Sequence, residues 1–203
     1  MEIEFIPDLH IYLIDGMMIP SVTSIIQRIL PNKYDGINKR VLERKAKYGT
    51  LGHKVIEEIG KNMMNCDEAL DFITDLYNQQ KINQDLFISL RDYVRLSRKY
   101  NIEPIENEKT VHYKYEYVGT LDMIAYVNGK KALLDMKFTA SLDKEHLSWQ
   151  LGMYKLASGE EFDEYYCIWL PKGKVGKLIP IEIKTKEEIL NKLEELKSGK
   201  VFN

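Results

Sequence analysis

The chain reads VGTLDMIAYV over residues 118–127, then Asn128-Gly129, then KKALLDMKFT over residues 130–139, and no other segment constrains its architecture as strongly. An Asn-Gly pair between two apolar runs is typical of a two-residue type I′ turn, because both central residues of that turn need a positive φ. The segment therefore predicts a β-hairpin in which Val127 pairs with Lys130.

Continuing that register places Asp122 opposite Asp135. It also places Thr120 opposite Lys137, and the four side chains share one face because side chains alternate along a strand. Like charges directly opposite each other are destabilising, and the apolar run before Asp135 indicates a buried position, where charges are seldom tolerated unpaired. A divalent cation would convert this repulsion into coordination. The carbonyl of Met136 could supply a further oxygen ligand, while its side chain is expected to enter the core.

The bulk composition narrows the class of protein. The chain has 203 residues, a net charge of −2 and a pI near 6.1, which argues against a protein that only coats nucleic acid. It contains no apolar run long enough to span a membrane, and residues 1–10 lack the features of a signal peptide, so we expect a cytoplasmic protein without a membrane partner. Cys66 and Cys167 match no metal-binding spacing and are expected to be buried, reduced thiols.

Hydrophobic periodicity predicts a single α/β domain with helices first and a mixed central β-sheet in the second half. A small hairpin is expected around Asp15-Gly16. Gly49-Thr50 is expected to interrupt a long helix, with Thr50 capping the part that carries His53. Helices are expected at 24–30, 37–61, 69–78, 84–100, 145–157 and 187–198, and strands at 10–14, 17–19, 102–127, 131–139, 165–170 and 178–183.

Two further pairs of polar residues lie four positions apart on predicted helices. His53 and Glu57 share one helical face, which could be an incidental surface pair or a supplement to the two carboxylates. One imidazole beside carboxylates suits Mn²⁺ or Mg²⁺, whereas a zinc site would need more ligands than this. Gln150 and Tyr154 share another face. Gln150 could equally be an exposed helix residue, while Tyr154 is expected to be partly buried with its hydroxyl hydrogen-bonded. On the hairpin strand, Gly119 would allow a ligand or backbone to approach closely.

Two helical segments concentrate positive charge. A charge run is usually a solvated helix face, but two basic faces beside a metal-binding hairpin would suit a phosphate backbone. The first set is Lys39, Arg40, Arg44, Lys45 and Lys47, and the second is Arg91, Arg95, Arg98 and Lys99.

Four motifs occur in a fixed order over residues 49–157, and together they are far more specific than any one of them. In this order the set resembles the PD-(D/E)XK nuclease superfamily, and most closely its RecB-like branch of CRISPR-associated and phage recombination exonucleases. The motifs are Gly49-Thr50-x-x-His53-x-x-x-Glu57, Gly119-Thr120-Leu121-Asp122, Asp135-Met136-Lys137 and Gln150-x-x-x-Tyr154.

This resemblance implies a restriction-endonuclease-like core, with residues 1–203 forming one nuclease domain. Residues 1–48 would be an N-terminal hairpin and helices, and residues 49–203 the catalytic core. Many RecB-like nucleases hold an iron–sulfur cluster with four cysteines, and two cysteines are too few for one.

The resemblance also assigns roles to single residues. The metal ligands would be His53, Asp122 and Asp135, and Lys137 would be catalytic beside the two aspartates. Gln150 and Tyr154 would help to position the DNA strand. Glu57 and Glu108 are weaker transfers, because acidic residues at such places vary in role.

These inferences lead to one expected activity, hydrolysis of DNA phosphodiester bonds with one or two Mg²⁺ or Mn²⁺ ions. An exonuclease of DNA recombination, repair or phage DNA processing, in a bacterial or phage-infected cytoplasm, is the first expectation. The alternatives are a structure-selective endonuclease and a non-catalytic module that holds DNA ends. A phage context would imply a single-strand annealing protein as partner, and a homo-oligomer is compatible with the family.

Overall fold

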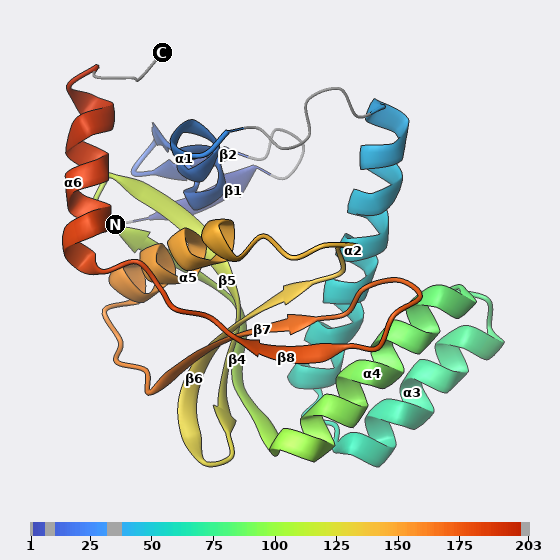
Figure 1. The fold of residues 1–203 in the computed structure, drawn as a ribbon. Helices are drawn as coiled ribbons and strands as arrows, with labels where there is room; N and C mark the ends of the chain where they lie inside the picture. The colour runs from blue at the N-terminus through green and yellow to red at the C-terminus, as the bar shows by residue number, and fades with distance from the viewer. Residues whose placement is uncertain (1, 7–10, 32–37, 200–203) are drawn as a thin grey trace.

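The computed structural model describes residues 2–6, 11–31 and 38–199. It shows an α/β fold in which a five-stranded mixed sheet is flanked by helices, beside a separate three-stranded sheet (Figure 1). The strands are β1 (Ile3–Ile6), β2 (Ile11–Ile14), β3 (Met17–Ile19), β4 (Ile102–Tyr113), β5 (Tyr117–Val127), β6 (Lys130–Lys137), β7 (Glu164–Trp169) and β8 (Lys177–Pro180). The helices are α1 (Val22–Ile29), α2 (Lys39–Lys61), α3 (Cys66–Asn78), α4 (Gln84–Tyr100), α5 (Lys144–Ser158) and α6 (Lys186–Lys197).

The large sheet has the strand order β4-β5-β6-β7-β8. Only β6 and β7 run parallel, and helix α5 forms the crossover between them. The central hairpin is the one the sequence predicts, because Asn128 and Gly129 have φ values of 49° and 80° and Val127 pairs with Lys130. The predicted register therefore holds as far as the pair of Met123 with Leu134.

Strands β5 and β6 part beyond that pair. The amide of Met136 donates to the carboxylate of Asp122 (Oδ2, 2.6 Å), where continued pairing would have used a backbone oxygen. The predicted pairings of Asp122 with Asp135 and of Thr120 with Lys137 are therefore both wrong, because the ladder between β5 and β6 ends at the pair of Met123 with Leu134. On its other side Thr120 pairs with Thr110 of β4. The polar side chains gather where the two strands separate.

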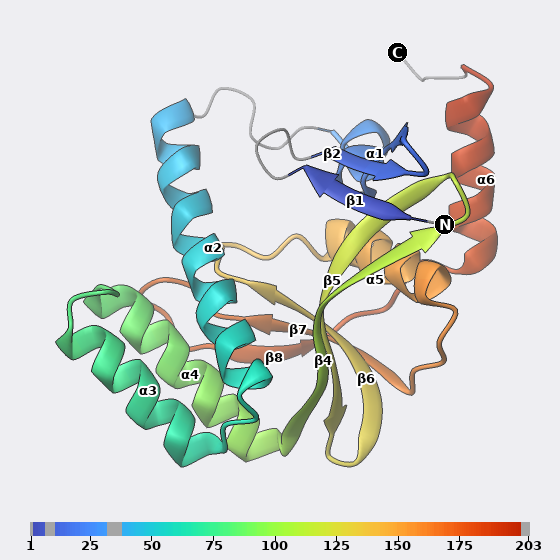
Figure 2. The same ribbon diagram turned by 180° about the vertical axis from the view of Figure 1, so that it is seen from behind.

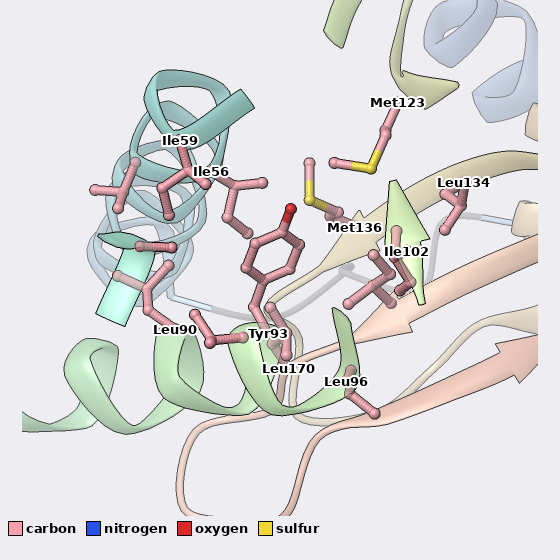
Figure 3. Close-up of a cluster of buried hydrophobic side chains, with 14 of the residues drawn as sticks. Ile56, Ile59, Leu90, Tyr93, Leu96, Ile102, Met123, Leu134, Met136 and Leu170 are labelled. Carbon is pink, nitrogen blue, oxygen red and sulfur yellow. The ribbon is translucent and has the colours of Figure 1, made fainter. Parts of the chain in front are cut away.

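Each face of the large sheet is covered by its own set of helices. Helices α2, α3 and α4 cover one face, and α1, α5 and α6 cover the other (Figures 1 and 2). Met136 points into the first core, where it lies among Met123, Leu134 and Tyr93 (Figure 3). Its predicted orientation is confirmed. The small sheet joins the far end of β5, where the Val118 amide donates to the carbonyl of Pro20 (3.1 Å).

Helix α2 differs from its prediction, because it continues without a break through Gly49-Thr50. An interior glycine costs a helix only about 1 kcal/mol, and the packing of α2 against the sheet outweighs that cost. The expected division at residues 48 and 49 therefore falls inside one helix. Its cap is Asn38, whose side chain accepts from the Arg40 amide (2.9 Å). The predicted starts at Ile37 and His10 lie outside the described residues.

Several other boundaries differ in smaller ways. The single strand expected over residues 102–127 is two strands, because the chain turns at Lys114, whose φ is 52°. Strand β1 was not predicted, and β8 ends at Pro180 instead of Ile183. Cys167 is buried as expected, whereas Cys66 is only half-buried. Among the described helices, none combines the length and apolarity needed to cross a membrane.

The central turn gives a stability prediction with a matched control. Gly129→Ala should destabilise the fold by about 1–2 kcal/mol, because alanine is strained at a φ of 80°. Gly49→Ala should stabilise it by about 0.5–1 kcal/mol, because a Cβ there meets nothing within 4 Å and Gly49 is helical. Urea unfolding of both variants measures these changes, and a neutral Gly129→Ala would contradict the assigned turn.

Candidate metal centre

Side chains from five elements converge where β5 and β6 part. The central hairpin supplies Asp122 from β5, and Asp135 and Lys137 from β6. The other contributors are His53 of α2, Glu108 of β4, and Gln150 and Tyr154 of α5. Asp122, Asp135 and Gln150 are buried, although each carries polar atoms.

Three of these residues form a group that could hold a metal ion. One ligand atom each from His53, Glu108 and Asp122 lies within 4.8 Å of the others. The Nδ1 atom of His53 is 3.7 Å from a carboxylate oxygen of Glu108 and 3.7 Å from one of Asp122. The structure thus joins His53 and Asp122 as predicted, and it adds Glu108, which the motifs supported only weakly.

The backbone of Glu108 is unusual for a strand residue. Its φ is 50°, a left-handed conformation that costs a residue with a side chain about 1–3 kcal/mol. It lies between the pairs of Asn107 with Met123 and Lys109 with Leu121, the position that faces Asp122. With this φ, the carboxylate of Glu108 lies at the candidate metal centre, close to His53. Nothing in the sequence signals this conformation.

Asp135 belongs to a second, adjoining set of contacts. Its Oδ1 accepts a hydrogen bond from the Lys137 ammonium (3.0 Å), which also donates to the Gln150 amide oxygen (3.1 Å). The Gln150 amide nitrogen in turn donates to the Tyr154 hydroxyl (3.3 Å). The interpretation of Gln150 as an exposed residue is therefore wrong, and the expectation that Tyr154 is buried and hydrogen-bonded is confirmed.

The remaining carboxylate oxygen of Asp135 has no hydrogen-bond partner among the described residues. This Oδ2 atom lies 2.8 Å from the Lys137 nitrogen, an ion-pair distance, but the contact lacks hydrogen-bond geometry. Burial raises the pKa of Asp135 to about 6, even though Lys137 opposes this shift. A buried carboxylate oxygen without a donor is suited to a cation.

The charges of the site also shift the pKa values of its two bases. Burial by itself would lower the pKa of His53, but Asp122, Glu108 and Asp135 together raise it to about 9. Burial likewise opposes protonation of Lys137, yet Asp135 and Asp122 raise its pKa above the usual value. At neutral pH without a metal, both side chains are therefore cations that partly neutralise the carboxylates.

The residues present fit a hard divalent cation. Carboxylate oxygens with one imidazole nitrogen suit Mg²⁺ or Mn²⁺, with the nitrogen favouring Mn²⁺. His53, Glu108 and Asp122 would hold it, and Asp135, which is outside this group, adds negative charge beside it. The structure shows Met136 as an amide donor to Asp122, so the role of its carbonyl stays a prediction.

Glu57 is placed apart from this group. Its carboxylate forms an ion pair with Lys61 in the next helical turn (2.5 Å). Glu57 therefore does not join the metal-binding group, although it shares a helical face with His53. Gly119 was expected to let a ligand or backbone approach closely, but in the structure it accommodates a side chain of the same protein. A Cβ atom at Gly119 would lie 2.8 Å from the Tyr154 ring, so the glycine makes room for that side chain.

The predicted basic faces have different surroundings. The side chain of Lys39 lies outside the described residues, Arg40 is exposed, and Arg44 lines a groove beside α2. On α4, Arg95 pairs with Asp92 (2.9 Å) and Arg98 with Asp67 (2.5 Å). The α4 set borders a separate hollow that shares no lining residue with that groove.

Comparison with known proteins places the chain in no family. No family model matches it. Over 125 residues it is 30% identical to the foldase protein PrsA of Geobacillus sp. (strain WCH70), and the match covers 60% of this chain and 44% of that protein. The chain thus spans less than half the length of this relative. The solved structure "Crystal structure of SSO0001" matches 63% of this chain, and the match covers 67% of that structure's chain, at 16% identity and a TM-score of 0.35.

The pKa of His53 predicts how metal binding depends on pH. A metal must displace the imidazolium proton, so Mn²⁺ affinity should rise about tenfold per pH unit between pH 7 and the pKa near 9. Without metal, the stability that protonated His53 contributes is present below about pH 6.5 and is lost as pH rises through about 9. Calorimetric Mn²⁺ titration at several pH values measures the slope. An unchanged slope in His53→Gln would contradict this assignment.

Two glutamates provide a matched pair of variants for the ligand set. Glu108→Gln should weaken Mn²⁺ binding about tenfold to a hundredfold, because it removes a carboxylate from the group. Glu57→Gln should leave the affinity within about twofold, because Glu57 pairs with Lys61 instead. The same titration compares them, and an equal loss in both variants would show that general negative charge binds the ion.

Proposed function

We propose that this protein is a Mg²⁺- or Mn²⁺-dependent deoxyribonuclease with a restriction-endonuclease-like core, acting as an exonuclease. The main support is that residues from four separate sequence motifs meet around one buried acidic centre. Asp122 is near enough to raise the pKa of Asp135, and His53 faces Asp122. Lys137 links Asp135 to Gln150. One buried oxygen of Asp135 forms an ion pair with Lys137 but has no hydrogen-bond donor among the described residues, which suits a site that binds a cation.

The chain's own residues suit phosphodiester hydrolysis. A bound Mg²⁺ or Mn²⁺ would polarise the phosphate and lower the pKa of a water molecule. Lys137, held as an ammonium by Asp135 and Gln150, would donate to a phosphate oxygen and offset the negative charge that builds there. Its raised pKa favours this function over proton abstraction.

Two side chains of α5, Gln150 and Tyr154, would help to orient the DNA strand. Burial keeps the Tyr154 phenol neutral by raising its pKa, and its oxygen accepts from Gln150, which leaves its own proton to donate. Gln150 bridges Lys137 and Tyr154, so a shift of one side chain displaces the others. Loss of either residue should therefore disturb the position of Lys137.

A degradation assay tests the proposal. Linear duplex DNA with labelled ends should shorten with Mg²⁺ or Mn²⁺ and survive with EDTA, while covalently closed circular DNA should stay intact. Asp135→Asn and Lys137→Gln should each slow degradation about a hundredfold to a thousandfold, since each removes a charge beside the reacting phosphate. Lys130→Gln is the matched control, because Lys130 lies at the other end of β6 and pairs with Glu164.

The outcomes separate the candidate functions. Cleavage of the closed circle would identify an endonuclease, and tight binding of DNA ends without metal-dependent turnover would identify a non-catalytic module. Degradation that continues unchanged in Asp135→Asn would refute the assigned site. A foldase, the activity named for the PrsA relative, would accelerate refolding of a denatured protein without needing Asp135 or Lys137.

A further inference from the structure

A second feature, a large groove, lies beside the candidate metal centre. It runs between the N-terminal half of α2, the turn from α3 to α4, and the loops that follow β6 and β7, all on one side of the molecule in Figure 1. Its volume is about 1280 Å³, larger than the roughly 300–1000 Å³ of pockets that enclose small molecules. It is also open to solvent, as an elongated ligand would need.

The charged side chains that line the groove are all positive. Five cationic side chains line it, and none of the lining residues among the described part of the chain is acidic. One of the five, Lys172, pairs with Asp85 outside the lining (2.6 Å). The chain as a whole has a net charge of −2, so this concentration of positive charge is local. The cations are Arg44, Lys45, Lys47, Lys81 and Lys172.

Aromatic rings are interleaved with these cations. Tyr48, Tyr77 and Phe138 line the groove. Tyr77 is exposed and stacks on Phe87, with ring centroids 4.6 Å apart, which fixes its orientation. Exposed aromatic rings beside cations are the combination that binds single-stranded nucleic acid, because bases stack on the rings while the cations contact phosphates.

The groove and the metal centre share a wall. Phe138, next to Lys137 in sequence, lines the groove and packs its ring against His53 (centroids 5.7 Å apart). Gly52, beside His53, makes room for that ring, because a Cβ atom there would lie 2.3 Å from it. Phe138 therefore lies between the groove and the carboxylates, and a strand in the groove would meet this ring before the metal centre.

We infer that this groove binds one strand of single-stranded DNA and directs it past Phe138 to the metal centre. The direction of the strand rests on the proposed nuclease function, whereas binding itself does not. Charge alone would also attract duplex DNA, but paired bases cannot stack on the exposed ring of Tyr77, which is the ring in this groove most open to a base. The groove accordingly selects an unpaired strand.

Binding measured without metal tests this inference separately from cleavage. The probe is a fluorescein-labelled thymidine oligonucleotide of about 12 nucleotides, a length within the usual site sizes of single-strand binders, followed by fluorescence anisotropy in EDTA over a series of salt concentrations. The groove variants are Lys47→Gln with Lys81→Gln, and Tyr77→Ala. The control is Arg98→Gln with Lys99→Gln, which removes equal charge from the α4 hollow. Circular dichroism of each variant shows whether it folds.

The expected results differ for each variant. The lysine pair should weaken binding at least tenfold and reduce the salt slope of log K by about 1.4, since each phosphate contact on a single strand contributes about 0.7. Tyr77→Ala should weaken binding about tenfold with the salt slope unchanged. The control pair should bind like the wild type, and a blunt duplex of the same length should bind at least tenfold more weakly.

Several results would overturn the inference. These are undetectable binding of the oligonucleotide by the wild type, equal losses in the groove and control pairs, or duplex binding as tight as single-strand binding. Polyglutamate that competes as well as unlabelled oligonucleotide would show that charge alone is recognised, and would also overturn it.

The two proposals can fail independently. If the groove variants lose oligonucleotide binding while Asp135→Asn has no effect on DNA degradation, the strand-binding groove stands and the nuclease proposal fails. If the groove variants bind DNA like the wild type while metal-dependent cleavage still requires Asp135, the groove inference fails and the nuclease proposal stands.

Discussion

The burial of two carboxylates at the point where β5 and β6 part is the constraint on which the rest of the site depends. Asp135 is almost completely enclosed, and Asp122 is buried beside it, so their negative charges must be balanced within the protein. Without metal, protonated His53 and Lys137 supply that balance, and their raised pKa values are its signature. The Met136 amide and the α5 side chains then fix the geometry. A divalent cation would replace part of this internal balance with coordination.

Much of the hairpin geometry could be predicted from the sequence, because Asn128-Gly129 admits few turns and β-strand alternation then places Asp122 and Asp135. Local signals of this kind fail where tertiary contacts determine how far a helix or a strand pairing extends. Gly49-Thr50 indicates a break, yet the packing of α2 keeps the helix continuous. The ladder between β5 and β6 ends at Met123 and Leu134, so Asp122 and Thr120 lack their predicted partners, and no local pattern encodes where it ends. Glu108 joins the site through a backbone conformation that its residue type disfavours, so the sequence supports it only weakly and does not separate it from Glu57.

The groove relates the reacting centre to the substrate. The acidic centre would repel a polyanion by itself, and the nearby cations of α2 and its neighbouring loops offset that repulsion. Phe138 connects the two regions, since one ring both lines the groove and packs on His53. The basic residues noted on α4 lie elsewhere, and two of them are engaged in ion pairs. Position relative to the carboxylates therefore distinguishes a candidate binding surface from an ordinary solvated helix face.

The proposed nuclease activity requires that the acidic centre bind a divalent cation. Anomalous X-ray scattering from crystals soaked in Mn²⁺ can decide this, because it locates manganese without assuming any activity. We expect a strong anomalous peak among His53, Glu108 and Asp122, and its loss in crystals of Asp122→Asn. Full occupancy elsewhere on the surface with no peak among these three residues would refute the metal centre.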